Sequence, residues 1–138
     1  MRIMGLDYGT KRIGVAMSDE LLLTAQGSKT IFNNTLSGTI AAIVKLIKEN
    51  EVVEVIVGLP ISMNGSHSQK TKEVIEFTQE LTKSVPVPVK TWDERLTTAQ
   101  AERALLEADM SRAKRKRLND MVAAQLILQG YLDHRRRG

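Results

Sequence analysis

The chain has 138 residues, of which 42% are hydrophobic and none is cysteine, and its formal net charge is +4. This length and apolar fraction predict one folded domain over residues 1–138 and exclude a disordered tail. The lack of cysteine excludes a disulfide framework and a thiolate metal site, and it favours a reducing compartment.

The apolar runs of the chain are short. None approaches the ~20 residues that a membrane span requires. The N-terminus, MRIMGLDYGTKRIGVAMSD, is interrupted by charged residues too early to form the core of a signal peptide. We therefore expect a cytoplasmic protein that has no membrane partner.

The N-terminal third predicts strands. Arg2–Asp7 and Arg12–Met17 are short apolar runs, and the turn-forming residues 8–11 between them indicate a β-hairpin. A third strand is expected between Leu21 and Phe32, although Gln26 and Gly27 interrupt its pattern. The chain thus opens with three strands.

The hydrophobic period then changes to that of a helix. Leu36, Ile40, Ile43 and Ile47 share one helical face, and residues 33–37 offer several N-cap candidates. The run Val52–Val57 follows and predicts a buried strand that stops at the loop 58–60. These residues form a helix and a fourth strand.

The last part of the chain predicts a helix, a strand and two more helices. Val74, Phe77 and Leu81 mark the inner face of the first helix, and the strand is Val89–Trp92. Residues 97–100 resemble a capping box, which would open a helix over Thr98–Ala108. The final helix is expected over about Asp120–Leu132, after a basic stretch.

This order of elements is that of an α/β, RNase H-like domain. A leading hairpin extended by βα units with right-handed crossovers gives a five-stranded mixed sheet in the order βββαβαβα, with helices on both faces. The first strand is then central, the last strand is parallel to it, and the final helix packs across the sheet.

Four acidic residues stand at the ends of these elements. Asp7 ends an apolar strand, where a carboxylate is costly to bury unless it is paired or binds a metal, although it could also be a turn residue. Asp93 and Glu94 end the last strand, where an ion pair with Arg95 is an alternative role. Asp120 begins the last helix as we expect it, and could be an ordinary N-cap.

The predicted sheet would bring these acids together at one spot. Converging carboxylates repel one another, and a hard cation such as Mg²⁺ or Mn²⁺ removes that repulsion because it prefers oxygen ligands. Two such ions about 4 Å apart can stabilise the attacking water and the leaving oxygen of a phosphodiester. The acids therefore indicate metal-dependent hydrolysis of nucleic acid.

Basic residues would bind the phosphates of such a substrate. Lys11 and Arg12 follow the first acid and could hold the scissile phosphate, and Arg95 could position a phosphate or its acidic neighbours. A basic stretch leads into Asp120 and could steer nucleic acid towards the acids. Its cationic residues are Arg112, Lys114, Arg115, Lys116 and Arg117. A solvated helix face and a frayed tail at Arg135–Arg137 are the alternative interpretation of the charge.

Three further residues have structural and functional interpretations. Gly9 and Gly14 would let backbone approach a polyanion, although a tight hairpin also requires glycine. Trp92 is the only tryptophan, and we expect it to pack in the core, with base stacking as the less favoured role.

Four motifs together resemble the YqgF/RuvX family, which is associated with Holliday junction resolution and with nuclease action on the 5′ end of precursor 16S rRNA. They are LDYGTKRIGVA at 6–16, VGLP at 57–60, DERLTT at 93–98 and DxxAAxxILQ at 120–129. The resemblance covers nearly the whole chain. It implies an RNase H-like fold and catalytic, metal-binding acids at Asp7, Glu94 and Asp120, with Asp93 as the alternative to Glu94. Glu94 is preferred because successive strand residues turn opposite ways.

The resemblance also implies partners. They are precursor rRNA or branched DNA, together with the ribosome-assembly machinery, and the ribosomal association favours RNA. RuvC-type resolvases are similar in fold but carry an acid at the end of the fourth strand. Here that strand ends in Gly58, Leu59 and Pro60, so the second acid would come from the neighbouring strand. A monomer and a homodimer are both compatible with the sequence.

Two other functions fit parts of the sequence. Asp7-Tyr8-Gly9-Thr10 also resembles the phosphate-binding turn of actin-like ATPases, but those enzymes close two such domains around a nucleotide and this chain is long enough for one. A non-catalytic RNA-binding factor for ribosome assembly could use the basic stretch alone. A requirement for metal and for all three acids would distinguish the nuclease from that factor.

Overall fold

The computed structural model describes residues 1–96 and 112–137, and within the last helix it describes side chains from Asp120 onward. The strands are β1 (Arg2–Asp7), β2 (Arg12–Ser18), β3 (Ala25–Phe32), β4 (Val52–Leu59) and β5 (Val89–Asp93). The helices are α1 (Leu36–Glu49), α2 (Gln69–Ser84) and α4 (Arg112–Arg137), with a short 3₁₀ helix η1 (Glu94–Leu96).

The strands form one mixed sheet in the order β3-β2-β1-β4-β5. β1 lies at its centre, antiparallel to β2 and parallel to β4, and β5 is parallel to β4 at the edge. The expected hairpin, the central first strand and the parallel last strand are therefore confirmed. The helix predicted over 98–108 and its capping box lie outside the described residues.

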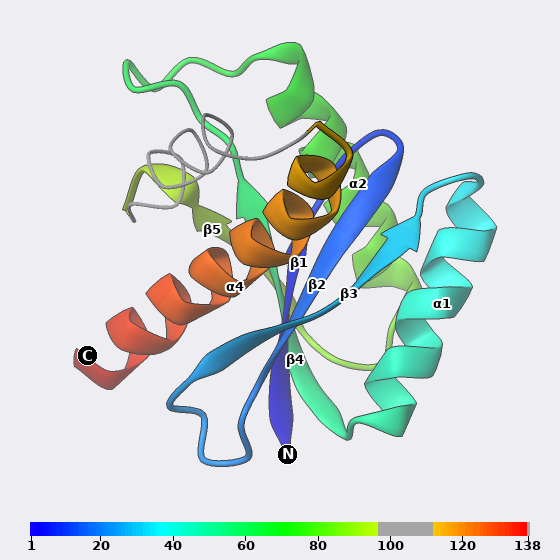
Figure 1. The fold of residues 1–138 in the computed structure, drawn as a ribbon, viewed down its shortest axis with the longest axis vertical. Helices are drawn as coiled ribbons and strands as arrows, with labels where there is room; N and C mark the ends of the chain where they lie inside the picture. The colour runs from blue at the N-terminus through cyan, green and yellow to red at the C-terminus, as the bar shows by residue number, and fades with distance from the viewer. Residues whose placement is uncertain (97–111, 138) are drawn as a thin grey trace.

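The two faces of the sheet are covered by different helices (Figure 1). Helix α4 crosses one face, and α1 and α2 cover the other. Because side chains alternate along a strand, each strand contributes to both layers. The α1/α2 layer includes Met4, Leu6, Ile13, Val15, Val55 and Val57. The α4 layer includes Ile3, Ala16, Ile56, Trp92, Ile127 and Leu128. The expectation that Trp92 packs in the core is confirmed, since 7% of it is exposed.

Helix α4 approaches the sheet closely because glycines line that face. A Cβ atom at Gly14 would lie 1.9 Å from the main-chain oxygen of Asp120, and one at Gly58 would lie 2.4 Å from Cδ1 of Ile127. At Gly5 the nearest atom would be Cβ of Leu128, at 2.7 Å. Gly14 is thus required for helix packing, and the idea that it makes room for a polyanion is not needed.

The start of α4 differs from the prediction. The helix begins at Arg112, so the basic stretch forms its first turns and Asp120 lies inside the helix instead of at its N-cap. Arginine, lysine and alanine are strong helix formers, which explains why the helix extends through this stretch. The helix also continues to Arg137, so the arginines at 135–137 are helical and do not form a frayed tail.

The third strand is shorter than the range in which it was expected. Asp19 folds residues 19–24 into a turn, because its Oδ1 accepts hydrogen bonds from the main-chain N–H groups of Leu23 (2.7 Å) and Thr24 (3.0 Å). β3 therefore begins at Ala25. The interruption at Gln26 and Gly27 coincides with a register shift against β2, so the strand continues through it.

Hydrophilic caps fix the ends of the other helices. Thr35 is the N-cap of α1, and its side chain accepts a hydrogen bond from the Gly38 N–H. Ser68 and Thr71 form a capping box at the start of α2.

In the part of the chain that is described, no helix is long and apolar enough to cross a membrane.

Candidate active site

The first candidate acid ends the central strand. Alternation along β1 places Asp7 on the α4 face together with Ile3 and Gly5, and 7% of the residue is exposed. Its partner on β2 is Gly14. On the other side Leu6 pairs with Val57, so Gly58 of β4 is the neighbour of Asp7. Asp7 thus lies between two glycines, beneath helix α4.

The second candidate acid reaches the same place from the adjacent strand. Glu94 follows β5 and is 2% exposed. Its Oε2 lies 3.4 Å from the position that a Cβ atom would take at Gly58. The carboxylate therefore lies over the end of β4, in space left open by a residue that has no side chain. This agrees with the expectation that the second acid comes from the strand beside β4.

The side chain of Asp93 is hydrogen-bonded to Arg95, two residues further along the chain. Both Nε (3.1 Å) and Nη2 (2.8 Å) of Arg95 donate to Oδ2 of Asp93, and the Arg95 main-chain N–H donates to Oδ1 (2.9 Å). These hydrogen bonds lower the pKa of Asp93 and raise that of Arg95. Of the two roles expected for Arg95, the described structure shows contact with an acidic neighbour. This geometry favours Glu94 over Asp93 as the residue that faces the other acids.

The third candidate acid lies on α4. The main chain of Asp120 packs against Gly14, which is the strand partner of Asp7. Its Oδ2 lies 3.2 Å from Nε of Arg12, and the two side chains are 24% and 27% exposed. Arg12 and Gly14 share one face of β2 because they are two residues apart. The cation expected to hold a phosphate therefore pairs with the third acid.

The donor atoms of this site suit a hard divalent cation. Asp7, Glu94 and Asp120 offer only carboxylate oxygens, the ligands that Mg²⁺ and Mn²⁺ prefer, and the first two are buried on one face. Among the described residues, no three His, Asp or Glu side chains already stand in a metal-binding arrangement. Asp120, paired with Arg12, has to reorient if it is to join the other two as a ligand.

Cations lie beside the acids on the hairpin. Lys11 and Arg12 line a cavity of about 460 Å³ whose other lining residues are Thr10, Phe32, Asn33 and Asn34. No motif of the sequence indicates a functional role for Phe32. The side chains of the expected cations at 112, 114, 115, 116 and 117 lie outside the described part of the chain.

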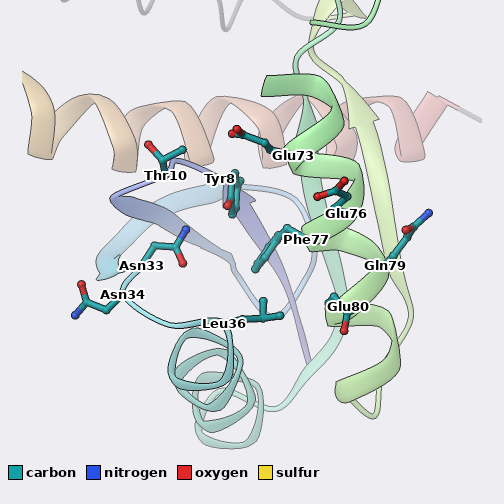
Figure 2. A pocket seen from close by; sticks show the side chains of 10 residues that line it. All are labelled: Tyr8, Thr10, Asn33, Asn34, Leu36, Glu73, Glu76, Phe77, Gln79 and Glu80. Carbon is teal, nitrogen blue, oxygen red and sulfur yellow. The ribbon is translucent and has the colours of Figure 1, made fainter. Parts of the chain in front are cut away.

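A second groove adjoins this cavity on the side of α1 and α2. It has a volume of about 530 Å³ and is rimmed by Glu73, Glu76 and Glu80 of α2. Figure 2 shows Tyr8 and Phe77 side by side within it, and their ring centroids are 4.7 Å apart. Its carboxylates would repel a polyanion. A polyanion would therefore be favoured at the hairpin cavity, which Lys11 and Arg12 line, over this groove.

Known proteins match this chain over nearly its whole length. The family model described as "RuvX: Holliday junction resolvase" matches residues 1–134. A protein of Halothermothrix orenii named "Putative pre-16S rRNA nuclease" is 54% identical over 137 residues, covering 97% of this chain and 96% of that protein. A protein of the same name from Myxococcus xanthus is 51% identical over 136 residues, covering 99% of this chain and 90% of that protein.

Solved structures confirm the fold. Thermus thermophilus RuvC in complex with a Holliday junction substrate superposes with a TM-score of 0.66 at 12% identity, covering 100% of this chain and 97% of that one. The fowlpox virus resolvase with Holliday junction DNA gives 0.56 at 13% identity, covering 97% and 98%. The α/β, RNase H-like fold expected from the order of elements is therefore confirmed. The chain belongs to the RuvX family, a family of nucleases, as its four motifs predicted.

Proposed function

We propose that this protein is a metal-dependent endonuclease that hydrolyses phosphodiester bonds at the 5′ end of precursor 16S rRNA. The observation that carries the proposal is the burial of two carboxylates, Asp7 and Glu94, on one face at the ends of neighbouring strands. Carboxylates that share one buried face repel one another, and a hard divalent cation relieves that repulsion because it prefers oxygen ligands. The names of two relatives more than 50% identical support the choice of substrate.

Asp7, Glu94 and Asp120 are the residues that would hold Mg²⁺ or Mn²⁺. When bound, such an ion stabilises negative charge on the phosphate oxygens and lowers the pKa of the attacking water. The strand ends fix the first two carboxylates, and the close packing of α4 on Gly14 fixes the main chain of the third. Arg12 neutralises the charge of Asp120 as long as no metal ion takes the place of Arg12 beside that carboxylate.

The cations of the chain would bind the substrate on either side of the acids. Lys11 and Arg12 stand on the hairpin, and the basic first turns of α4 lead towards Asp120. The net charge of +4 favours a polyanionic partner. Precursor rRNA and its assembly factors are partners in the cytoplasm, where we place this protein.

The test is cleavage of a labelled precursor 16S 5′-end RNA and of a four-way DNA junction, each with Mg²⁺, Mn²⁺ or EDTA. Asp7→Asn should abolish cutting, because it removes a charge while keeping the size of the side chain. Asp133→Asn is the matched control, since that residue lies on α4 roughly 20 Å beyond Asp120 at 1.5 Å per residue. Calorimetric titration with Mn²⁺ should show weaker binding to Asp7→Asn than to the control.

Each outcome decides between functions. Metal-dependent cutting of the RNA that is lost in Asp7→Asn supports the proposal, and cutting of the junction alone moves the substrate to branched DNA. Full activity of Asp7→Asn would exclude the site. Tight RNA binding with no cutting in any metal would leave the non-catalytic assembly factor as the better account.

A further inference from the structure

One aromatic side chain stands apart from the rest. Phe32 is 73% exposed at the end of β3, an edge strand of the sheet. The chain has four other aromatic residues, all buried or half-buried: Tyr8, Phe77, Trp92 and Tyr131. An exposed phenylalanine gains little from the hydrophobic core, so it contributes little to the stability of the fold. Its ring face is available to a ligand.

The strand register places Phe32 beside the candidate active site. Phe32 is the cross-strand partner of Arg12, and Thr30 is the partner of Gly14. Paired residues on neighbouring strands point to the same face of a sheet. Phe32 therefore projects on the α4 face, next to the arginine that pairs with Asp120.

The cavity at this position has groups suited to each part of a nucleotide. Its volume of about 460 Å³ lies within the range of small-molecule sites, about 300–1,000 Å³. Lys11 and Arg12 can bind phosphate, and the Phe32 ring, which lies beside Arg12, can stack on a base. Asn33 makes the wall rigid, since its side chain donates to the Gly9 carbonyl (2.8 Å) and accepts from the Thr39 hydroxyl (3.0 Å).

We propose that Phe32 stacks on the base of an unpaired nucleotide while Lys11 and Arg12 hold its phosphate beside the acids. A base inside an intact duplex is already stacked on both faces, so it cannot present a face to the ring. The substrate class of the nuclease is therefore a strand with an unpaired nucleotide next to the cut. This inference rests on the proposed function for the position of the cut, but the nucleotide-binding site itself does not depend on cleavage.

The charge around the cavity determines the path of the bound nucleic-acid strand over the protein surface. Thr10, Asn33 and Asn34 line both this cavity and the acidic groove of α2, so the two hollows adjoin. Figure 2 shows Glu73 and Glu76 on the α2 side, away from the two asparagines. These carboxylates repel phosphates. The nucleic-acid strand consequently continues from Phe32 across the α4 face and not towards α2.

The test compares binding of a short single-stranded RNA of mixed sequence with that of its blunt-ended duplex, both in EDTA so that nothing is cut. Phe32→Ala should bind the single strand roughly ten- to a hundredfold more weakly, the range typical of one stacked base, and the duplex within about twofold of the parent. Leu21→Ala is the matched control, because Leu21 is 76% exposed in the β2–β3 turn. All variants should melt at the same temperature as the parent.

Phe32→Trp supplies a direct readout of stacking. The variant should keep the affinity for the single strand, and its emission should be quenched by the single strand but not by the duplex. The tryptophan already present, Trp92, is 7% exposed and gives a constant background. Unchanged affinity of Phe32→Ala, or an equal loss for single strand and duplex, would overturn the inference. Quenching in Phe32→Trp without cleavage in any metal would support the stacking site and would contradict only the proposed nuclease activity.

Discussion

The two faces of the sheet differ in the residues that line them. The α1/α2 face is lined by large aliphatic side chains, and Ile13, Val15 and Val55 are fully buried there. The α4 face has glycines at closely packed positions, together with Asp7 and Arg12. Burying one large aliphatic side chain stabilises a protein by about 1.5–3 kcal/mol, whereas a glycine contributes no side-chain burial. Both faces therefore bury apolar side chains, but the α4 face gives up part of that stability to bring charged groups from three segments together.

This difference has a testable consequence. Substitutions on the α1/α2 face should lower the free energy of unfolding and leave the rate of cleavage per folded molecule unchanged. Substitutions of charged residues on the α4 face should lower the rate of cleavage and leave the free energy of unfolding nearly unchanged. Glycine substitutions on the α4 face should affect both quantities, since they move the helix that carries Asp120.

Among the substitutions predicted here, the largest loss of stability is expected at Leu81 of α2, a fully buried residue of the α1/α2 face. Leu81→Ala should lower the free energy of unfolding by about 2–5 kcal/mol, because it removes buried methyl groups and leaves a cavity. Urea denaturation measures this loss. Cleavage by the folded fraction should match the parent, and a large loss in the cleavage rate of fully folded Leu81→Ala would show that the two faces are not independent.

On the α4 face, Glu94→Gln should leave the protein folded and reduce cleavage at least a hundredfold. A hundredfold loss corresponds to about 2.7 kcal/mol of activation free energy at 1.36 kcal/mol per tenfold. The amide keeps the volume of the side chain that lies over Gly58 but removes its charge. Single-turnover cleavage in Mg²⁺ measures the effect, and circular dichroism checks the fold.

The neighbouring acid is the control for Glu94. Asp93 binds Arg95 through its side chain, so Asp93→Asn should retain cleavage within a few-fold of the parent. The reverse result, with Asp93→Asn inactive and Glu94→Gln active, would exchange the roles of the two acids.

Gly14→Ala should weaken both properties. The new Cβ atom would meet the Asp120 main-chain oxygen at 1.9 Å, and backbone cannot move aside as a flexible side chain can. Overpacking of this kind costs about 1–3 kcal/mol, and here it also displaces Asp120, so cleavage should fall with stability. Gly27→Ala is the matched control, because its nearest contact would be Cβ of Met121 at 3.3 Å. If Gly14→Ala behaves like Gly27→Ala in thermal melting, the close packing of α4 is not required.

The architecture could be predicted because its signals are local. Alternation in β1 and β4 and the helical period of α1 each depend on residues close in sequence. Asp7 was identifiable as an acid at the end of an apolar strand, and Glu94 through strand alternation. The RuvX motifs separately indicated the family, and the family match confirms it.

The details that depend on distant residues could not be predicted. Arg12 pairs with Asp120, 108 positions away, and no local pattern indicates that contact. The requirement for glycine at positions 14 and 58 depends on which helix packs above them. The predicted start of the last helix, at about Asp120, is too late, because a run of positive charge resembles a loop although its residues favour helix. The exposure of Phe32 follows from its place on an edge strand, which the sequence does not reveal.

The smallest expected effect concerns the Asp93–Arg95 pair, whose side chains are 22% and 31% exposed. Arg95 lowers the pKa of Asp93 below its usual 3.8. The pair therefore stabilises the fold fully above that value, and the contribution is lost as the pH falls from 3.8 through the lower pKa of the folded state. Asp93→Asn should cost at most about 1 kcal/mol at pH 7, as is usual for ion pairs near the surface.

Urea denaturation at pH 7 and near pH 2 measures this contribution in the parent, Asp93→Asn, Arg95→Gln and the double variant. The coupling free energy from this cycle should be present at pH 7 and smaller at the acidic pH. A coupling that does not change with pH would mean that the carboxylate charge of Asp93 contributes nothing. In that case the hydrogen bond from the Arg95 main-chain N–H to Asp93, which is independent of the Arg95 side chain, would be what holds the turn after β5.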